Sequence, residues 1–309
     1  MQETRSGLSN NPESNAKQTS DLKGLMPPER PTAKSMWRLL LFFIFYMIFR
    51  LLVETAISVG FLAFGPSFPE PFLSFFMTPS DIPDVEYSLS GNGTVIVSAI
   101  GFIVAGLMIR AKAFEYDSKF TPKKESPVSF YALTALASVG LAIFLNILIA
   151  KSGIIEISED YAEVAASQYS CSFAVGLIVY GFISPLSEEL MFRGILYNGF
   201  KRYFMKPAAL LLCAAFFALY HGNGVQGMYS FVMSVFIIYA YEKSGDFKIC
   251  ILIHMVCNLA AYILTYGYPY LSADLVWMLF AVSFALAGTC IIFMFFRDRI
   301  PGLKKASDE

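Results

Sequence analysis

Residues 181–194 read GFISPLSEELMFRG and place Glu188, Glu189 and Arg193 inside a long apolar segment. Charged side chains at the centre of a bilayer are costly, so they usually face the protein interior and mark a functional site. Glu189 and Arg193 have i, i+4 spacing, which puts them on one helical face where they can pair. Glu188 points about 100° away from Glu189 and is free for another role. One arginine neutralises one carboxylate, so the second carboxylate is a candidate acid or base. The alternative is a buried ion cluster without chemistry.

The composition predicts that most of the chain lies in a membrane. Of the 309 residues, 56% are hydrophobic and 15% are charged, which is outside the usage of soluble domains. A spanning helix needs about 20 apolar residues, and the chain is therefore predicted to be an all-α integral membrane protein with about eight transmembrane helices. The predicted helices are 37–63, 93–110, 128–150, 171–200, 207–222, 225–242, 248–266 and 274–296. The net charge of −1 does not indicate a nucleic-acid partner.

The distribution of charge between the loops predicts the orientation of the chain. Basic residues gather before the first helix, in 110–124, 201–206 and 243–248, and after the last helix. The loops 64–92 and 151–170 are acidic. Because lysine and arginine accumulate on the cytoplasmic side, we expect both termini to be cytoplasmic.

We expect four regions along the chain. Residues 1–35 are polar and lack an apolar core, so they are predicted to be a disordered cytoplasmic tail. Residues 36–170 hold helices one to three with their loops, 171–266 form a helical core that carries the polar motifs, and 267–309 hold the last helix and a cytoplasmic tail. The stretch Ile154–Ser170 is amphipathic and acidic. It either lies along the outer surface or is a solvated loop.

Both histidines of the chain lie in two further intramembrane motifs. Phe217-Ala-Leu-Tyr-His221 ends the fifth predicted helix and places Phe217 one turn before His221. Phe217 is expected to form the wall of a pocket around His221. In His254-Met-Val-Cys-Asn258, the histidine and the asparagine share one helical face. Both side chains can donate hydrogen bonds toward a common point, which suits an oxyanion site.

The series Glu188-Glu189-x-x-x-Arg193, Phe217-x-x-x-His221 and His254-x-x-x-Asn258 resembles the CPBP family of intramembrane proteases. This family includes the type II CAAX prenyl endopeptidases, bacterial proteins linked to bacteriocin processing and immunity, and lysostaphin-resistance-like proteins. The resemblance covers about residues 172–263. It implies a multi-pass endopeptidase of the cell membrane that acts on a peptide or membrane protein, lipidated or not.

The resemblance also implies roles for individual residues. Glu188 and His221 would activate the attacking water, and His254 and Asn258 would stabilise the tetrahedral oxyanion. Glu189 and Arg193 would support the site. In chemical terms, a carboxylate in a low-dielectric cavity takes a proton from water, and fixed donors receive the charge that develops on the carbonyl oxygen.

Alternatives remain open at this point. Glu188, Glu189, His221 and His254 are suitable ligand types for zinc, but the chain lacks HExxH, and a metal-free glutamate mechanism is favoured. No other cofactor is expected. A non-catalytic immunity or scaffold protein of the same fold is the main alternative function. A proton-coupled transporter is disfavoured, because no repeat relates the two halves.

The predicted topology places a condition on the two histidines. If the fifth helix runs outward from Pro207, His221 ends near the outer face, whereas His254 lies only six residues beyond cytoplasmic Lys248. A common site requires the fifth helix to start deep in the headgroups, to tilt, or to end in a loop inside the bundle. Irregular backbone at membrane depth is allowed where it lines a protein cavity.

Overall fold

Long apolar helices dominate the structure, a computed structural model that describes residues 32–83, 85–121 and 126–296. Within these ranges, seven helices are long and apolar enough to cross a membrane. The predicted all-helical, multi-pass fold is confirmed. The predicted tails lie mostly outside the described residues. The orientation of the chain in the membrane stays a prediction.

The helices follow the predicted segments closely. The long ones are α2 (Ala33–Phe64), α4 (Gly91–Phe120), α5 (Val128–Lys151), α11 (Gly224–Ser244), α12 (Lys248–Gly267) and α13 (Ala273–Phe296). The fourth span is continuous but changes its pitch, as α7 (Phe173–Ile178), η2 (Val179–Ile183), α8 (Ser184–Glu189), η3 (Leu190–Tyr197) and α9 (Asn198–Lys201). The shorter helices are α3 (Glu70–Phe76), α6 (Glu159–Gln168) and α10 (Lys206–Tyr220), with 3-10 turns η1 (Gly65–Ser67) and η4 (Tyr268–Tyr270).

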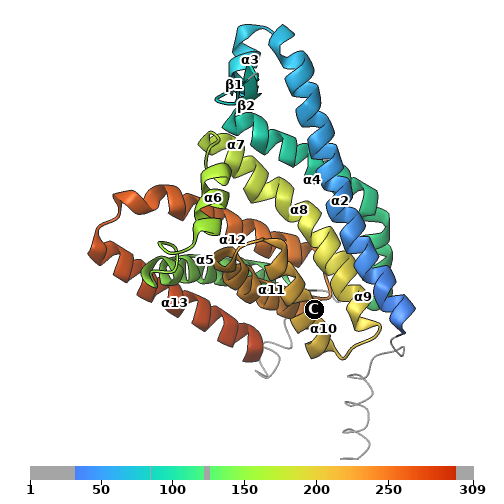
Figure 1. Cartoon of the computed structure of the whole chain (residues 1–309). Coiled ribbons are helices and arrows are strands. Elements are labelled where there is room, and N and C mark those ends of the chain that lie inside the picture. Colours follow the sequence, from blue (N-terminus) through green and yellow to red (C-terminus); the bar gives the residue numbers. More distant parts are fainter. Residues whose placement is uncertain (1–31, 84, 122–125, 297–309) are drawn as a thin grey trace, which may run out of the picture.

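The fifth predicted span differs from the other seven. It forms α10, a helix of only 15 residues, which is about 22 Å long and shorter than a hydrocarbon core of about 30 Å. Pro207 lies in its first turn, and the helix ends at Tyr220 before a tight turn. Gly222 has φ 73° in this turn, a conformation that glycine adopts without a steric penalty. The chain then reverses into α11, so α10 and α11 form an antiparallel pair (Figure 1).

The other helices enclose the fourth span. α4 packs against α8 and η3, with α2 on its outer side, while α12 packs against η2 and α8 from the other direction. α5 lies along α12, and α13 covers α5 at the edge of the bundle. The start of α2 and the end of α13 lie at the same end of the molecule in Figure 1. The fourth span is therefore the central element, and its polar residues face protein rather than lipid.

The loop 64–92 contains structure that the sequence analysis did not predict. Strands β1 (Met77–Pro79) and β2 (Tyr87–Leu89) pair antiparallel, with Met77 opposite Leu89. Aromatic side chains hold this hairpin and α3 on α2, since the Phe61 and Phe76 rings stack with centroids 5.1 Å apart. Both strands are too short for the periodicity that identifies a strand from sequence.

A buried polar network joins α4, α9 and α11 at the end of the bundle that holds α9. The Tyr241 hydroxyl donates to Asp117, and the Asn198 amide donates to Tyr241 at 3.1 Å. Lys201 lies 2.7 Å from Glu242 and donates to Thr121 at 2.8 Å. Each buried charge thus has a partner, as burial in an apolar bundle requires. The network fixes the register of the fourth span against its neighbours.

Close packing between the fourth span and α4 gives a first testable prediction. A Cβ atom added at Gly194 would lie 2.6 Å from the Cβ of Ala113, whereas one added at Gly288 meets nothing within 4 Å. We expect Gly194→Ala to destabilise the fold by about 1–3 kcal/mol through overpacking. Gly288→Ala should leave stability unchanged or raise it by up to about 1 kcal/mol through helix propensity. Thermal unfolding in detergent measures the stability of both variants. Equal melting temperatures for Gly194→Ala and Gly288→Ala would contradict the close packing of Gly194 against Ala113.

Candidate functional site

The fourth span carries its polar residues on a backbone with two π-helical segments, η2 and η3. Pro185 has no N–H to donate to the preceding turn, which removes one α-helical hydrogen bond. The wider π turn of η2 ends directly before this position. Such π segments occur often at functional sites. Here they flank α8, so Glu188 and Glu189 are displayed on a short α-helical turn between two irregular ones.

Glu189 is the centre of a fully buried ion cluster. Its Oε1 accepts hydrogen bonds from Arg193 Nη1 at 2.7 Å and from His254 Nδ1 at 2.7 Å. The Glu189 and Arg193 side chains are both 0% exposed. The Arg193 guanidinium also lies over the Phe217 ring, 4.5 Å from its centroid, a favourable cation–π contact. The predicted pairing of Glu189 with Arg193 is present, and it extends to α12 through His254.

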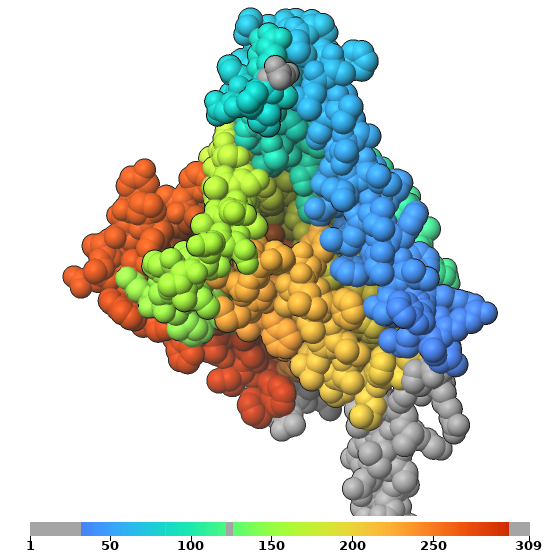
Figure 2. Space-filling model, in the orientation of Figure 1, coloured from blue at the N-terminus to red at the C-terminus, as the bar shows by residue number. Residues whose placement is uncertain are grey.

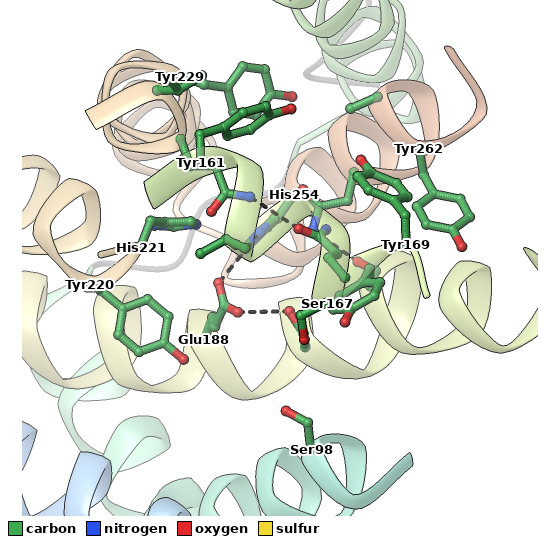
Figure 3. A pocket seen from close by; sticks show the side chains of 18 of the residues that line it. Ser98, Tyr161, Ser167, Tyr169, Glu188, Tyr220, His221, Tyr229, His254 and Tyr262 are labelled. Atoms are coloured by element: carbon green, nitrogen blue, oxygen red, sulfur yellow. Dashed lines mark hydrogen bonds and ion pairs between the residues drawn. The ribbon is translucent and has the colours of Figure 1, made fainter. Parts of the chain in front are cut away.

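Glu188 is held differently from its neighbour. Ser184, one turn earlier, donates to Glu188 Oε1 at 2.7 Å. The other oxygen, Oε2, lies 3.8 Å from His254 Nε2, which is beyond hydrogen-bond length. Glu188 therefore has one oxygen fixed by a hydroxyl and one oxygen without a direct hydrogen bond, facing a histidine across a small gap (Figure 3).

His221 is fixed through its Nδ1. This nitrogen lies 2.7 Å from the carbonyl oxygen of Phe217, and because a carbonyl only accepts, Nδ1 is the donor. In the neutral ring Nε2 is then unprotonated and able to accept a proton. The Phe217 ring makes edge contacts with both imidazoles, with centroids 4.9 Å from His221 and 5.6 Å from His254. Phe217 thus packs against both histidines, and its predicted role as the pocket wall of His221 stays a prediction.

The short helix α10 brings the two histidines to one cavity. His221 follows the last residue of α10, and His254 lies in the second turn of α12. Both side chains line the same cavity. Asn223 in the turn caps α11 by accepting from the Gln226 N–H at 2.8 Å, and it is buried. Gly222 and Gly224 of the same turn are exposed, and His221 is partly buried.

Asn258 lies one turn after His254 on α12. Its Nδ2 donates to the carbonyl oxygen of Tyr180 in η2 at 2.9 Å. An amide NH₂ carries two hydrogens, so one remains to donate into the cavity. The bond to Tyr180 uses a carbonyl in a π-helical segment and fixes the amide relative to Glu188.

The four side chains Glu188, His221, His254 and Asn258 line a single cavity of about 470 Å³. This volume is in the range of ligand pockets. Residues from α2, α4, α5, α6 and α11 complete the wall. Figure 2 shows a hollow between the blue α2 and the yellow-green segment that holds α6. The amphipathic acidic stretch is helix α6, and Tyr161, Ser167 and Gln168 on it line the cavity (Figure 3).

The candidate zinc ligands are not arranged as a metal site. Among the residues that the structure describes, no group of three or more His, Cys, Asp or Glu side chains is placed to hold a metal ion. Nδ1 of His254 and Nδ1 of His221 bind Glu189 and the Phe217 carbonyl, so only Nε2 of each ring could bind a metal. In the described part of the chain, Glu188, Glu189 and the two histidines do not converge as three or more metal ligands, and so they do not fit zinc.

A comparison with protein families supports the resemblance seen in the motifs. Residues 170–260 match the family model described as type II CAAX prenyl endopeptidase Rce1-like. This segment is an Rce1-like domain of the type II CAAX prenyl endopeptidase family. It contains the fourth span, α10, α11 and the part of α12 that carries His254 and Asn258. No curated protein and no solved structure shows significant similarity to the chain.

Several residues around the endopeptidase domain were missed by the sequence analysis. Ser184 lies inside the quoted motif at i, i+4 from Glu188, a spacing that was available as a signal. Arg50 and Glu54 have the same spacing in the otherwise apolar first span and were also readable as an intramembrane pair. Tyr180 gives no such signal, because its contribution is a backbone carbonyl.

The buried cluster of the endopeptidase domain gives the second prediction. Arg193→Leu leaves Glu189 charged and without its arginine in a fully buried position, which typically destabilises by about 3–5 kcal/mol. The matched control is Lys112→Leu, since Lys112 pairs with Glu115 at 2.9 Å on the surface, with side chains 35% and 57% exposed. Such a surface pair contributes about 0–1 kcal/mol.

The double variant Glu189→Leu/Arg193→Leu tests whether the loss of stability comes from the Glu189 carboxylate left without its arginine. It should be more stable than Arg193→Leu alone, because no uncompensated carboxylate remains. Thermal unfolding of the purified protein measures all three variants. If Arg193→Leu lowers the melting temperature no more than Lys112→Leu does, the ion cluster does not stabilise the fold as we predict.

Proposed function

We propose that the protein is a membrane endopeptidase that hydrolyses a peptide bond with a water molecule activated by Glu188. The CAAX prenyl endopeptidase domain suggests a protease. The observation that carries the proposal is the shared cavity. It is lined by Glu188, which has one carboxylate oxygen without a hydrogen bond 3.8 Å from His254 Nε2, and by His221 and Asn258. This arrangement contains a base and hydrogen-bond donors, as peptide-bond hydrolysis requires.

The first step is the activation of water. Oε2 of Glu188 is the proton acceptor, because Ser184 already donates to Oε1. His221 supplies a second acceptor at Nε2, since its Nδ1 proton is directed to the Phe217 carbonyl. Two acceptors define the orientation of the two water hydrogens, so a lone pair of the water oxygen is directed at the substrate carbonyl carbon.

The second step is the stabilisation of the charge on the carbonyl oxygen. The free hydrogen of Asn258 Nδ2 is one donor, and His254 donates from Nε2 when its ring is protonated. Glu189 accepts from His254 Nδ1, which orients the ring. Removal of one oxyanion donor typically lowers turnover about 10²–10³-fold.

The third step is the release of the amine. The C–N bond breaks as the oxyanion collapses, and the leaving nitrogen takes a proton. Glu188 holds the proton that it removed from water, so transfer of this proton to the nitrogen restores the carboxylate. The proton taken from water is thus the proton given to the leaving nitrogen. Glu188 acts first as base and then as acid, and no external proton donor is needed.

The substrate class follows from the position of the cavity. The lining combines the apolar residues Met47, Phe102 and Ile149 with the catalytic candidates, and it lies among helices with the hydropathy of membrane spans. A peptide or a segment of a membrane protein, with or without a lipid, is the proposed substrate. The cell membrane is the proposed location.

Replacement of the base gives the third prediction. Glu188→Gln keeps volume and hydrogen bonding but cannot accept the proton, so cleavage should fall by about 10²–10⁴-fold with unchanged melting temperature. Membrane peptidomics of a strain with this variant should reveal an accumulated precursor, which the purified wild-type protein then cleaves. Glu163→Gln on α6, at an exposed carboxylate, is the control with full activity.

His221→Ala and His254→Ala extend the same test. Both are expected to lose cleavage while the protein is still produced and inserted. Full activity of the Glu188→Gln variant rejects the endopeptidase mechanism. A biological phenotype that persists in this variant without any cleavage indicates the non-catalytic immunity or scaffold function instead.

The metal-free mechanism gives the fourth prediction. Cleavage should be unchanged after incubation with EDTA or 1,10-phenanthroline, because no ligand set for zinc converges in the cavity. Elemental analysis of the purified protein should find far less than one zinc per chain. Loss of activity on chelation that zinc restores, together with stoichiometric zinc, contradicts the mechanism.

A further inference from the structure

An arginine of the first span faces the catalytic cavity from outside the endopeptidase domain. Arg50 lies in α2, whose membrane window is apolar and only 6% buried. Its side chain is 21% exposed and lines the same cavity as Glu188, His221 and His254. Arg193, by contrast, is fully buried in the Glu189 cluster. An arginine inside an apolar span usually serves a function.

Three contacts hold the Arg50 guanidinium in one place. Glu54 Oε1 lies 3.0 Å from Nε, and Nη1 donates to the hydroxyl of Tyr220. The Phe102 ring lies under the guanidinium, with its centroid 4.3 Å from Cζ. Glu54 is itself fixed, since its Oε1 accepts from Ser98 at 3.2 Å. The positive group is therefore pre-organised and does not need to reorient when a ligand binds.

The contacts leave donors unused. A guanidinium has five N–H groups, and Glu54 and Tyr220 engage one each. No hydrogen bond of Nη2 to another described residue occurs. The free edge of the group carries the geometry that binds a carboxylate with two parallel hydrogen bonds. Tyr220 precedes His221 directly, so the guanidinium is tied to the catalytic turn.

We propose that Arg50 binds a carboxylate of the peptide substrate and so determines which peptides are cleaved. This inference rests on the proposed function and names its substrate class: peptides that carry a carboxylate close to the scissile bond. The carboxylate is either the free C-terminus or an Asp or Glu side chain. Arg50 is a specificity residue, while Glu188 performs the chemistry.

The electrostatics of the cavity favour such a ligand at this one position. Glu54 and Glu188 repel an anion that approaches elsewhere, and Arg50 offsets this repulsion only within reach of its free edge. A charge-assisted hydrogen bond in a partly desolvated site changes affinity by roughly 10- to 100-fold. Wild-type protein should therefore prefer a peptide acid over its amide by about that factor.

The test compares three forms of one short apolar peptide with a fluorescent label. The forms are the free acid, the C-terminal amide, and the amide with glutamate as last residue. Binding to the full-length Glu188→Gln protein in detergent is measured by fluorescence anisotropy, so the result does not depend on cleavage. The preference for one of the two acidic forms identifies the source of the carboxylate.

Variants of Arg50 decide the outcome. In the Glu188→Gln background, Arg50→Gln should abolish the preference by weakening the acidic form about 10- to 100-fold while the amide binds as before. Arg50→Lys should keep part of the preference, since it keeps the charge but loses the planar fork. Arg110→Gln, at an exposed residue of α4, is the control that leaves the preference unchanged.

Two results overturn the inference. One is equal binding of all three forms to the protein that retains Arg50. The other is an equal loss of binding affinity for the acid and the amide in the Arg50→Gln variant, which indicates that Arg50 only supports the fold. Where peptides are also cleaved, Arg50→Gln in the otherwise wild-type protein should raise KM for the acidic form and leave kcat nearly unchanged. Absent cleavage with a retained binding preference rejects the proposed function and not the role of Arg50.

Discussion

Oε1 of Glu189 accepts one hydrogen bond from Arg193 on its own span and one from His254 on α12. This single oxygen ties the two helices that carry the catalytic candidates and neutralises one of the two adjacent carboxylates. Glu188 is consequently left without a cation of its own and keeps an oxygen free for a proton. The two neighbouring glutamates thus have distinct environments, which is the basis of the different roles that we propose for them.

Irregular backbone is the second requirement of the site. The π segments η2 and η3 flank the turn with both glutamates, and η2 also offers the Tyr180 carbonyl that holds Asn258. The short helix α10 ends at Tyr220, and the turn that follows places His221 on the cavity that His254 also lines. A regular set of full-length helices would have separated His221 from His254. The geometry of the candidate site thus depends on departures from ideal helices.

The residues of the site were readable from the sequence because membranes reject charge. Glu188, Glu189, Arg193 and both histidines stood out against apolar surroundings, and i, i+4 spacing related Glu189 to Arg193 and His254 to Asn258. The partners of these groups were harder to find. Ser184 and Arg50 gave weak local signals, whereas the carbonyls of Phe217 and Tyr180 gave none. Backbone acceptors are present at every residue, so the sequence does not distinguish the one that is used.

Hydropathy and local spacing by themselves determined the membrane fold, the helix positions and the polar motifs, because burial in lipid acts on each segment separately. The tertiary structure decided what depends on packing between segments. It placed His221 and His254 on one cavity, gave the loop 64–92 its hairpin, and brought α6 and Arg50 of the first span to the same cavity. These contacts join residues far apart in the chain, and their geometry follows from how side chains fill the space between helices.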